Sequence, residues 1–470
     1  MNVTHAHRGR RQFLTGTLAL AAASAVGGHN PREVLVLGAG LSGLYAAILL
    51  QDLGFRVRVI EARQRVGGRL RTLGEAPFHS EAGGNLIGPN YGRVIATAAR
   101  LGVELQPPPA GLPMDYLIQG RTILRNEWAT SPGNPLTGTL RQLRPEQLPS
   151  ALLQPNPLAA SSDWCSQELA DTDVSVSDFL SGNNAPESAV ALLEANLSYG
   201  ESLSSTSLLS MFRVRQGIAR AMAFGRPVLE VRGGNQRLPE AMAASLKNPV
   251  ELGKQVLGIR ASEDRVSAEL LSGAIIDADA VLITLPAPAL RNIRFSPDLP
   301  EDQQEAIQTV RYQRVTQMHY RLDVPAWEKT GRSGGWWTDG PLGRIFVRPV
   351  QAGGPYLLTV WITGSACAET DAMGDEAATS LIDRRLRQLM PEIAGELHTM
   401  GLVRWQHEPF NGGAWATWRP GQTGTFFRAL HRPQDRIFFA GEHAAYSHSG
   451  MEGAMESAER ACLDLVRRLA

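Results

Sequence analysis

The pattern of apolar positions near the start of the chain predicts a strand, a helix and a second strand. Residues 33–37 form a short run rich in branched apolar side chains, which is typical of a buried strand. Apolar residues then recur at helical spacing, at Leu41, Leu44, Tyr45, Ile48 and Leu49. Residues 56–60 predict the next strand, so this segment has the order of a parallel βαβ unit.

Later segments show the same two periodicities. Strands are predicted at residues 256–260, 266–270, 280–285 and 436–440. Helices are predicted through Leu238 and Met242, and from Gly450 through Met455, Ala458, Cys462 and Leu465. The stretch from Pro107 to Pro157 is rich in Pro, Gly and Leu, and we expect it to be an irregular cover over a site.

Composition and charge narrow the function classes. A chain of 470 residues with 43% hydrophobic residues is long enough for two domains. Its 46 basic residues balance its 46 acidic ones, which argues against nucleic acid or an anionic membrane and favours a small-molecule partner. Cys165, Cys367 and Cys462 lack metal-ligand spacing, so we expect buried thiols and no metal site.

The first 30 residues form a separate segment. Arg10-Arg11-Gln12-Phe13-Leu14 and the mildly apolar stretch after it resemble a twin-arginine export signal, with Ala23-Ser24-Ala25 as a cleavage site. The stretch is too short and too rich in small residues for a stable membrane span. This resemblance implies export to the periplasm or the outside by the twin-arginine machinery; the alternative is a disordered basic tail.

A glycine motif lies between the first predicted strand and helix. In Gly38-Ala39-Gly40-Leu41-Ser42-Gly43, Gly38 permits a sharp turn, Gly40 lets a pyrophosphate approach, and Gly43 lets the helix pack on the strand. The helix N-terminus, including Ser42, then offers N–H groups to phosphates. Glu61, at the end of the second strand, is placed to bind ribose hydroxyls, which disfavours NADP.

The residues after Glu61 indicate which dinucleotide binds. The segment from Ala62 to Arg69, with Arg63, Gly68 and Arg69, resembles the arginine and double-glycine motif of glutathione-reductase-like flavoproteins. That resemblance implies FAD, with the Gly-Gly-Arg part near its pyrophosphate and ribityl chain.

Two further segments resemble the flavin monoamine oxidase and L-amino-acid oxidase family. Glu81 to Pro89, which includes Gly84, Asn85 and Leu86, is similar to the segment that runs past the flavin. Gly441-Glu442-His443 and Gly450-Met451-Glu452-Gly453 are similar to the closing FAD motif. By this resemblance Glu442 and Met451 contact FAD, as does the backbone of Val256, and a helix N-terminus near Met451 stabilises the reduced flavin.

The resemblance also implies the domain organisation and the fold class. The fold is α/β combined with α+β: a Rossmann-type FAD-binding domain interleaved with a substrate domain of mixed sheet and helices. We expect the FAD-binding domain to comprise residues 31–110, 226–290 and 400–470. Residues 111–225 and 291–399 are expected to form the substrate-binding domain.

The chemistry expected of this family is oxidation of an amine by hydride transfer to flavin N5, with O2 or another acceptor taking the electrons. Trp415 matches the first of two aromatic rings that guide a neutral amine, but Gly450 stands where the second belongs. Ala414 replaces the cysteine that links FAD covalently in mitochondrial enzymes, so we expect non-covalent FAD. No lysine follows Leu285-Pro286, and Asn292 or a neighbouring arginine is the candidate for its role near N5.

The substrate class stays open at this stage. Leu86 stands where L-amino-acid oxidases place a carboxylate-binding arginine, which favours an amine, although Arg93, Arg213 or Arg215 are alternatives. His443 or His448 is either a general base or a structural histidine. A flavin desaturase or isomerase for an apolar substrate, and a catalytically silent FAD-binding protein, are the competing functions, and a homodimer is left open.

Overall fold

The computed structural model describes residues 32–351, 353–393 and 395–469. The predicted export signal lies outside these residues and stays a prediction. None of the helices in the described ranges is long and apolar enough to cross a membrane.

A parallel sheet brings together three distant parts of the chain. Its strand order is β2-β1-β12-β21, which places the strand nearest the C-terminus in the same sheet as the first two. The strands are β1 (Glu33–Leu37), β2 (Arg56–Ile60), β12 (Ala280–Ile283) and β21 (Ile437–Phe439). The predicted strands are therefore confirmed, although β12 and β21 are shorter than expected. Strands from the beginning, the middle and the end of the chain thus lie in one sheet.

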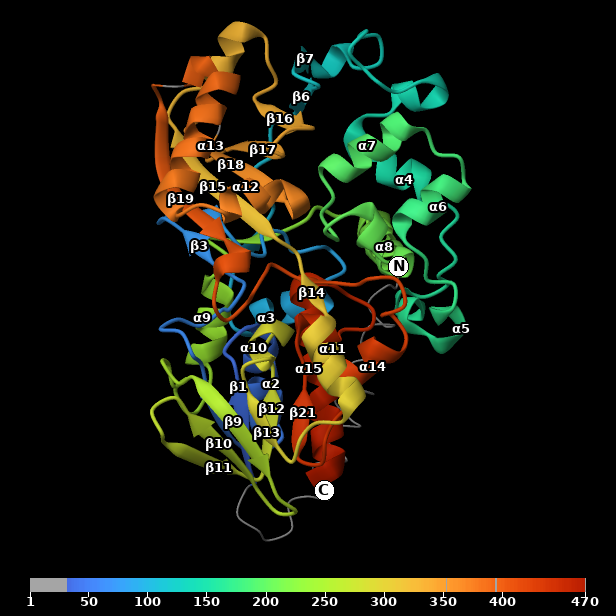
Figure 1. Cartoon of the computed structure of the whole chain (residues 1–470). Helices are drawn as coiled ribbons and strands as arrows, with labels where there is room; N and C mark the ends of the chain where they lie inside the picture. Colours follow the sequence, from blue (N-terminus) through green and yellow to red (C-terminus); the bar gives the residue numbers. More distant parts are fainter. Residues whose placement is uncertain (1–31, 352, 394, 470) are drawn as a thin grey trace, which may run out of the picture.

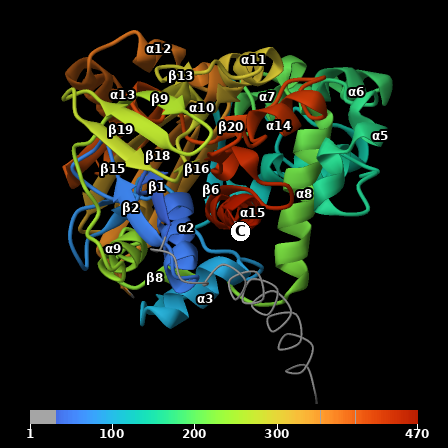
Figure 2. The same ribbon diagram turned by 90° about the horizontal axis from the view of Figure 1, so that it is seen from below.

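Helices cover this parallel sheet, and a second sheet lies beside it. In Figure 1 helices α2 and α15 run next to each other, and Figure 2 shows both of them beside α3. The helices are α2 (Leu41–Asp52), α3 (Gly92–Arg100), α9 (Arg237–Ala244) and α15 (Gly450–Leu469). The second sheet has the order β11-β10-β9-β13, from β9 (Val256–Ala261), β10 (Val266–Leu270), β11 (Ile275–Ala278) and β13 (Arg294–Ser296). Strand β13 pairs with β9, so residues 294–296 belong to this second sheet although they follow residue 290, where the domain limit was expected.

The other half of the molecule contains a seven-stranded sheet and a group of helices. The strand order is β19-β15-β18-β17-β16-β6-β7. These strands are β6 (Met114–Ile118), β7 (Arg121–Ile123), β15 (Val315–Leu322), β16 (Gly335–Thr338), β17 (Arg344–Pro349), β18 (Tyr356–Thr363) and β19 (Leu397–Arg404). Helix α13 (Asp375–Leu389) packs on one face of the sheet, and its Ile382 and Leu386 share a core with the strands.

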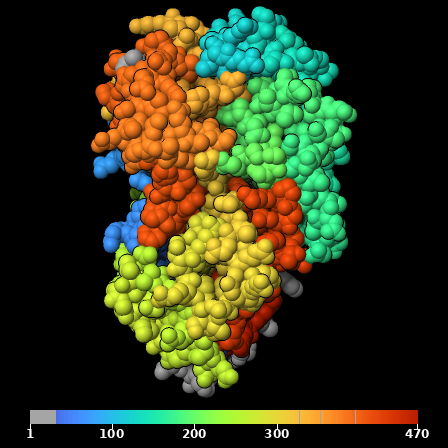
Figure 3. Space-filling view, viewed as in Figure 1, coloured from blue at the N-terminus to red at the C-terminus, as the bar shows by residue number. Residues whose placement is uncertain are grey.

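The helices of this half lie beside the sheet in Figure 1. They include α4 (Leu148–Leu152), α6 (Val176–Gly182), α7 (Glu187–Ala195) and the long α8 (Leu208–Ala223). In the lower part of the space-filling view, residues near 300 (yellow) lie between the four-stranded sheet of β9, β10, β11 and β13 and the red C-terminal segments (Figure 3). Residues 107–157 were expected to form an irregular cover over a site, and the expectation is wrong for β6, β7 and α4, which are regular elements of this stretch. Tertiary pairing with β16 makes β6 a strand despite its Pro- and Gly-rich surroundings.

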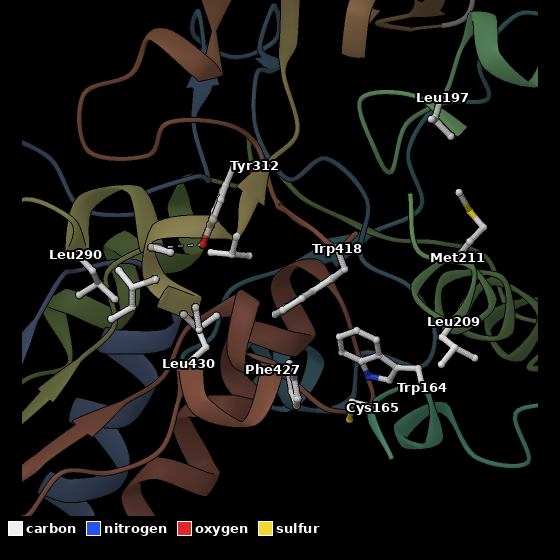
Figure 4. Close-up of a cluster of buried hydrophobic side chains, with 14 of the residues drawn as sticks. Trp164, Cys165, Leu197, Leu209, Met211, Leu290, Tyr312, Trp418, Phe427 and Leu430 are labelled. Carbon is white, nitrogen blue, oxygen red and sulfur yellow. Dashed lines mark hydrogen bonds between the residues drawn. The ribbon is translucent and has the colours of Figure 1, made fainter. Parts of the chain in front are cut away.

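An aromatic cluster joins the helices to the C-terminal segments. Trp164 packs edge-on against Trp418 and Phe427, with ring centroids 5.4 and 4.9 Å away (Figure 4). Cys165 is buried next to them, and Cys367 and Cys462 are buried elsewhere. The prediction of three buried thiols is confirmed, and the described residues contain no cluster of side chains suited to a metal ion.

A buried polar junction joins the start of the chain to the segment before α9. The Glu81 carboxylate accepts hydrogen bonds from the Asn235 backbone N–H at 2.8 Å and from Thr72 Oγ1 at 3.1 Å. Asn235 in turn donates from Nδ2 to the carbonyl oxygen of Gly84 at 2.8 Å. Burial raises the pKa of Glu81 to about 7, against the lowering effect of these hydrogen bonds.

Replacement of Gly43 by Ala will destabilise the protein, because the added Cβ would lie 1.9 Å from the carbonyl oxygen of Gly38. We expect a loss of about 2–3 kcal/mol in the free energy of unfolding, measured by denaturant titration. Gly217→Ala is the matched control: it lies in α8 with open space around its Cβ, and a gain of about 0.5–1 kcal/mol is expected. Equal stability of the two variants would contradict this packing.

The raised pKa of Glu81 predicts that the protein's stability against unfolding depends on pH. Between the ordinary pKa of 4.5 and about 7 the native state holds a proton that the unfolded state has lost, so stability falls as pH rises through this window. Glu81→Gln removes that loss. The free energy of unfolding of the variant relative to wild type should rise by on the order of 3 kcal/mol from about pH 5 to about pH 8. A difference that does not change with pH would refute the assignment.

Candidate functional site

A cavity of about 510 Å³ lies where the parallel sheet meets the seven-stranded sheet. It brings together residues that are far apart in the sequence, and nearly all of the predicted site residues contribute to its lining. These are Gly38, Gly40, Ser42, Glu61, Arg63, Gly68, Arg69, Gly84, Asn85, Val256, Asn292, Trp415, Glu442 and Met451. Gly43 and Leu86 are the predicted residues outside the lining.

The turn between β1 and α2 has the shape of an anion site. Gly38 has a φ of +99°, a left-handed conformation that favours glycine, and Gly43 allows α2 to approach Gly38 closely. A Cβ at Gly40 would meet nothing within 4 Å, so the space in front of this residue is open. The buried hydroxyl of Ser42 has no hydrogen-bond partner in the described residues. An open backbone, a helix N-terminus and an unpaired hydroxyl together fit a phosphate group.

The end of β2 supplies the acidic group expected for a ribose. The Glu61 carboxylate is buried and accepts hydrogen bonds from the backbone N–H groups of Ala39 and Arg63, both at 2.9 Å. These bonds fix the carboxylate against the glycine turn at the wall of the cavity.

Arginines on this side of the cavity are paired with acidic residues. Arg69 Nη1 donates to Glu442 Oε2 at 3.0 Å and to the Ala414 carbonyl oxygen at 2.9 Å. Arg63 and Arg71 share the Glu408 carboxylate at 3.4 and 3.0 Å. The positive charge near the glycine motifs is therefore largely neutralised by the protein itself.

The segment from Ala82 to Leu86 passes along the cavity beside the C-terminal helix. A Cβ at Gly84 would lie 3.3 Å from Cγ of Met451, so this glycine lets the backbone approach the start of α15. Leu86 points elsewhere: its side chain is 43% exposed and does not line the cavity. Its predicted contact with a cofactor therefore has no support in the geometry.

Aromatic rings form the wall on the side of the seven-stranded sheet. Trp415 donates from Nε1 to the carbonyl oxygen of Ser198 at 3.0 Å. It stacks on Trp361 of β18 with centroids 6.5 Å apart and an interplanar angle of 27°, and it contacts Tyr199 at 5.7 Å. Both tryptophans line the cavity, so the predicted ring at Trp415 is part of a larger apolar wall.

Gly450 lines the cavity, and one phenol lies near it. This glycine has a φ of +61°, and a Cβ placed on it would lie 3.6 Å from the Tyr91 hydroxyl. A phenol from the N-terminal end of α3 therefore stands next to the position where the second ring was expected.

Neither of the two candidate histidines lines the cavity. His443 is buried, and burial together with the charges of Arg69 and Arg460 lowers its pKa to about 3, so the imidazole is neutral. His448 Nδ1 lies 2.9 Å from Glu456. Burial alone would raise the pKa of Glu456, but its hydrogen bonds to the His448 ring and to nearby backbone N–H groups lower it to about 2. The structural role is favoured for both histidines.

Asn292 and the arginine candidates occupy different environments. Asn292 is exposed at one rim of the cavity, and its Nδ2 lies 3.4 Å from the Pro288 carbonyl oxygen. Arg93 pairs with Glu452 and Glu459, and Arg213 donates to the Ala445 carbonyl oxygen. These two arginines are held by protein groups and are not placed to bind a carboxylate in the cavity.

The seven-stranded sheet contributes residues to the cavity that no sequence motif predicted. Val315 and Gln317 of β15 and Trp361 of β18 line the cavity, and no motif marks them. The alternation of apolar Met318, Tyr320 and Leu322 with polar residues would have predicted strand β15. It would not have shown which face meets the cavity.

Comparison with known proteins agrees with this geometry. The family model of flavin containing amine oxidoreductases matches residues 41–466. The chain is 29% identical to an L-amino-acid oxidase of Siganus canaliculatus, covering 93% of this chain and 86% of that protein. It is 27% identical to the human flavin-containing amine oxidase B, covering 94% and 87%.

Solved structures show the same fold. A redesigned putrescine oxidase superposes with a TM-score of 0.79 at 21% identity, covering 93% of this chain and 99% of that one. Cyclohexylamine oxidase from Brevibacterium oxydans superposes with a TM-score of 0.76 at 24% identity, covering 94% and 100%. The fold, the cavity and the match over residues 41–466 show that this chain belongs to the flavin-containing amine oxidase family and is an oxidoreductase.

Proposed function

We propose that this chain oxidises a primary or secondary amine to an imine, with non-covalently bound FAD as the electron acceptor and O2 as the final one, giving hydrogen peroxide. The observation that carries the proposal is a single cavity shared by the phosphate-type turn at Gly40 and the aromatic wall at Trp415 and Trp361. When bound, FAD would supply the redox chemistry by accepting a hydride from the α-carbon of the amine.

The described residues of the lining contain hydroxyl groups at Ser42 and Thr284 and an amine at Lys254, but no group that would activate a hydroxyl as a nucleophile. They include no histidine or cysteine, and the carboxylates of Glu61 and Glu442 are occupied by hydrogen bonds and an ion pair. Gly40, Ser42 and Glu61 would hold the phosphate and ribose groups of the cofactor. Trp415 and Trp361 would hold the amine in a neutral form and exclude water. The imine then hydrolyses after release.

The cofactor should be released by denaturation. Ala414 lies in the cavity wall at the position of the linking cysteine in mitochondrial enzymes, and its methyl group cannot form a bond to the flavin. After acid precipitation of the purified holoprotein, we expect FAD fluorescence in the supernatant and a colourless pellet. Flavin retained in the pellet would contradict non-covalent binding.

The reaction itself is tested by a panel of amines and L-amino acids, followed as peroxide release and as anaerobic bleaching of the bound flavin. We expect bleaching by at least one amine, because the cavity offers the aromatic wall that a neutral amine needs. Bleaching of the flavin without release of peroxide would show that the final electron acceptor is a compound other than O2. A holoprotein whose flavin no amine or amino acid bleaches would overturn the proposal.

Trp415 provides the matched variants for the same assay. Trp415→Ala removes the ring and its bond to Ser198, and kcat/KM should fall by about tenfold or more. Trp415→Phe keeps an aromatic face and should retain more activity. Cys165→Ala, in the buried cluster away from the lining, controls for general damage to packing.

A further inference from the structure

One row of side chains crosses the seven-stranded sheet from the cavity wall outwards. Gln317 of β15 is directly opposite Trp361 of β18, and Trp361 is directly opposite Arg344 of β17. Residues opposite each other in neighbouring antiparallel strands share a face, with Cβ atoms about 5 Å apart. Gln317 and Trp361 line the cavity. Arg344 lies on the same face of the sheet, one strand farther from the cavity, and is not part of the lining.

The guanidinium of Arg344 has no acidic partner in the described part of the chain. Its Nη2 donates to Ser198 Oγ at 2.7 Å, and its buried Nε has no hydrogen-bond partner. The carbon of the guanidinium lies 5.7 Å from the ring centroid of Phe346. This environment contrasts with that of Arg63 and Arg69, each of which is neutralised by a glutamate.

A second arginine near the same place also lacks an acidic partner. Arg215 of α8 bonds to the Ser150 hydroxyl, and no ion pair of Arg215 occurs among the described residues. Burial raises the pKa of Tyr199. The positive charges of Arg344 and Arg215 oppose that rise and the negative charge of Glu442 adds to it, so all three charged groups act on this phenol. Burial lowers the pKa of Arg344 to about 10, so the group remains a cation at neutral pH.

Direct contacts connect this positive region to the aromatic wall. Ser198 accepts the Trp415 indole N–H through its carbonyl oxygen while its hydroxyl accepts from Arg344. Tyr199 contacts Trp415, and Phe346 contacts Trp361 edge-on at 6.2 Å. The charge is thus separated from the two cavity tryptophans by a single layer of side chains.

We infer that Arg344 selects amines that carry a carboxylate and disfavours amines that carry a second positive charge. A guanidinium with free donors in an apolar setting gains from a carboxylate, and a second ammonium group would be repelled there. The positive charge of Arg215 also acts on Tyr199 and adds to the same field. The inference rests on the proposed amine oxidation, and it narrows the substrate class of that reaction.

The test compares substrates of equal length on the FAD-loaded protein: hexylamine, the straight-chain ω-amino acid, L-norleucine and the terminal diamine. For wild type, we expect one of the two amino acids to have the highest kcat/KM and the diamine the lowest. Arg344→Gln should raise KM for the preferred amino acid by about tenfold with a smaller change in kcat, and should lower kcat/KM for hexylamine by a clearly smaller factor. Arg121→Gln, an exposed arginine on β7 of the same sheet, is the control and should alter none of these values.

A binding measurement separates failure of this inference from failure of the proposed function. Hexanoate should bind wild-type holoprotein more tightly than hexanol does in calorimetry, and Arg344→Gln should weaken hexanoate by about tenfold. This result would stand even if no amine bleached the flavin. Bleaching by hexylamine together with a wild-type preference for the diamine, or hexanoate binding that Arg344→Gln does not change, would overturn the selection by charge and leave the amine oxidation intact.

Discussion

The ion pair between Arg69 and Glu442 is the contact on which the cavity depends. It joins the second glycine motif to the C-terminal motif, and the same Arg69 nitrogen donates to the carbonyl oxygen of Ala414. Glu442 also accepts the backbone N–H of Ala416 at 3.2 Å. A buried charge that loses its partner costs several kcal/mol, so these three segments are stable only when assembled together. The parallel sheet imposes the same assembly, because β21 joins it next to β12.

Once those charges are paired, the two ends of the cavity differ in their electrostatics. Arg63 and Arg69, the two arginines of these motifs that line the cavity, have glutamate partners, so the N-terminus of α2 and the open backbone at Gly40 are the groups available to an anion there. On the side of the seven-stranded sheet the balance is reversed, because Arg344 has aromatic neighbours and a hydroxyl but no acid among the described residues. The two ends of the cavity therefore differ in charge because Arg344, unlike Arg63 and Arg69, has no acidic partner among the described residues.

The sequence predicted those parts of the fold and the site that depend on neighbouring residues, and it did not predict the parts that depend on contacts between distant segments. β1 and β2 were predicted with their exact bounds, because their apolar runs lie beside local turn signals. The glycine roles followed from backbone geometry that the motif itself encodes. Strand β6 was missed because it forms only through pairing with β16, which is distant in the sequence. The orientation of Leu86 and the cavity face of Trp361 are set by tertiary packing, and no local pattern reports them.

The Tyr91 phenol lies near Gly450, the position where the second ring was expected, although Tyr91 does not line the cavity. Tyr91 reaches this place because α3 is held against α15 by Glu452, which accepts the Arg93 backbone N–H and pairs with its guanidinium at 3.1 Å. Gly450 itself is in a left-handed conformation that a larger residue would strain. The position of the Tyr91 phenol near Gly450 is therefore determined by the contact between two helices.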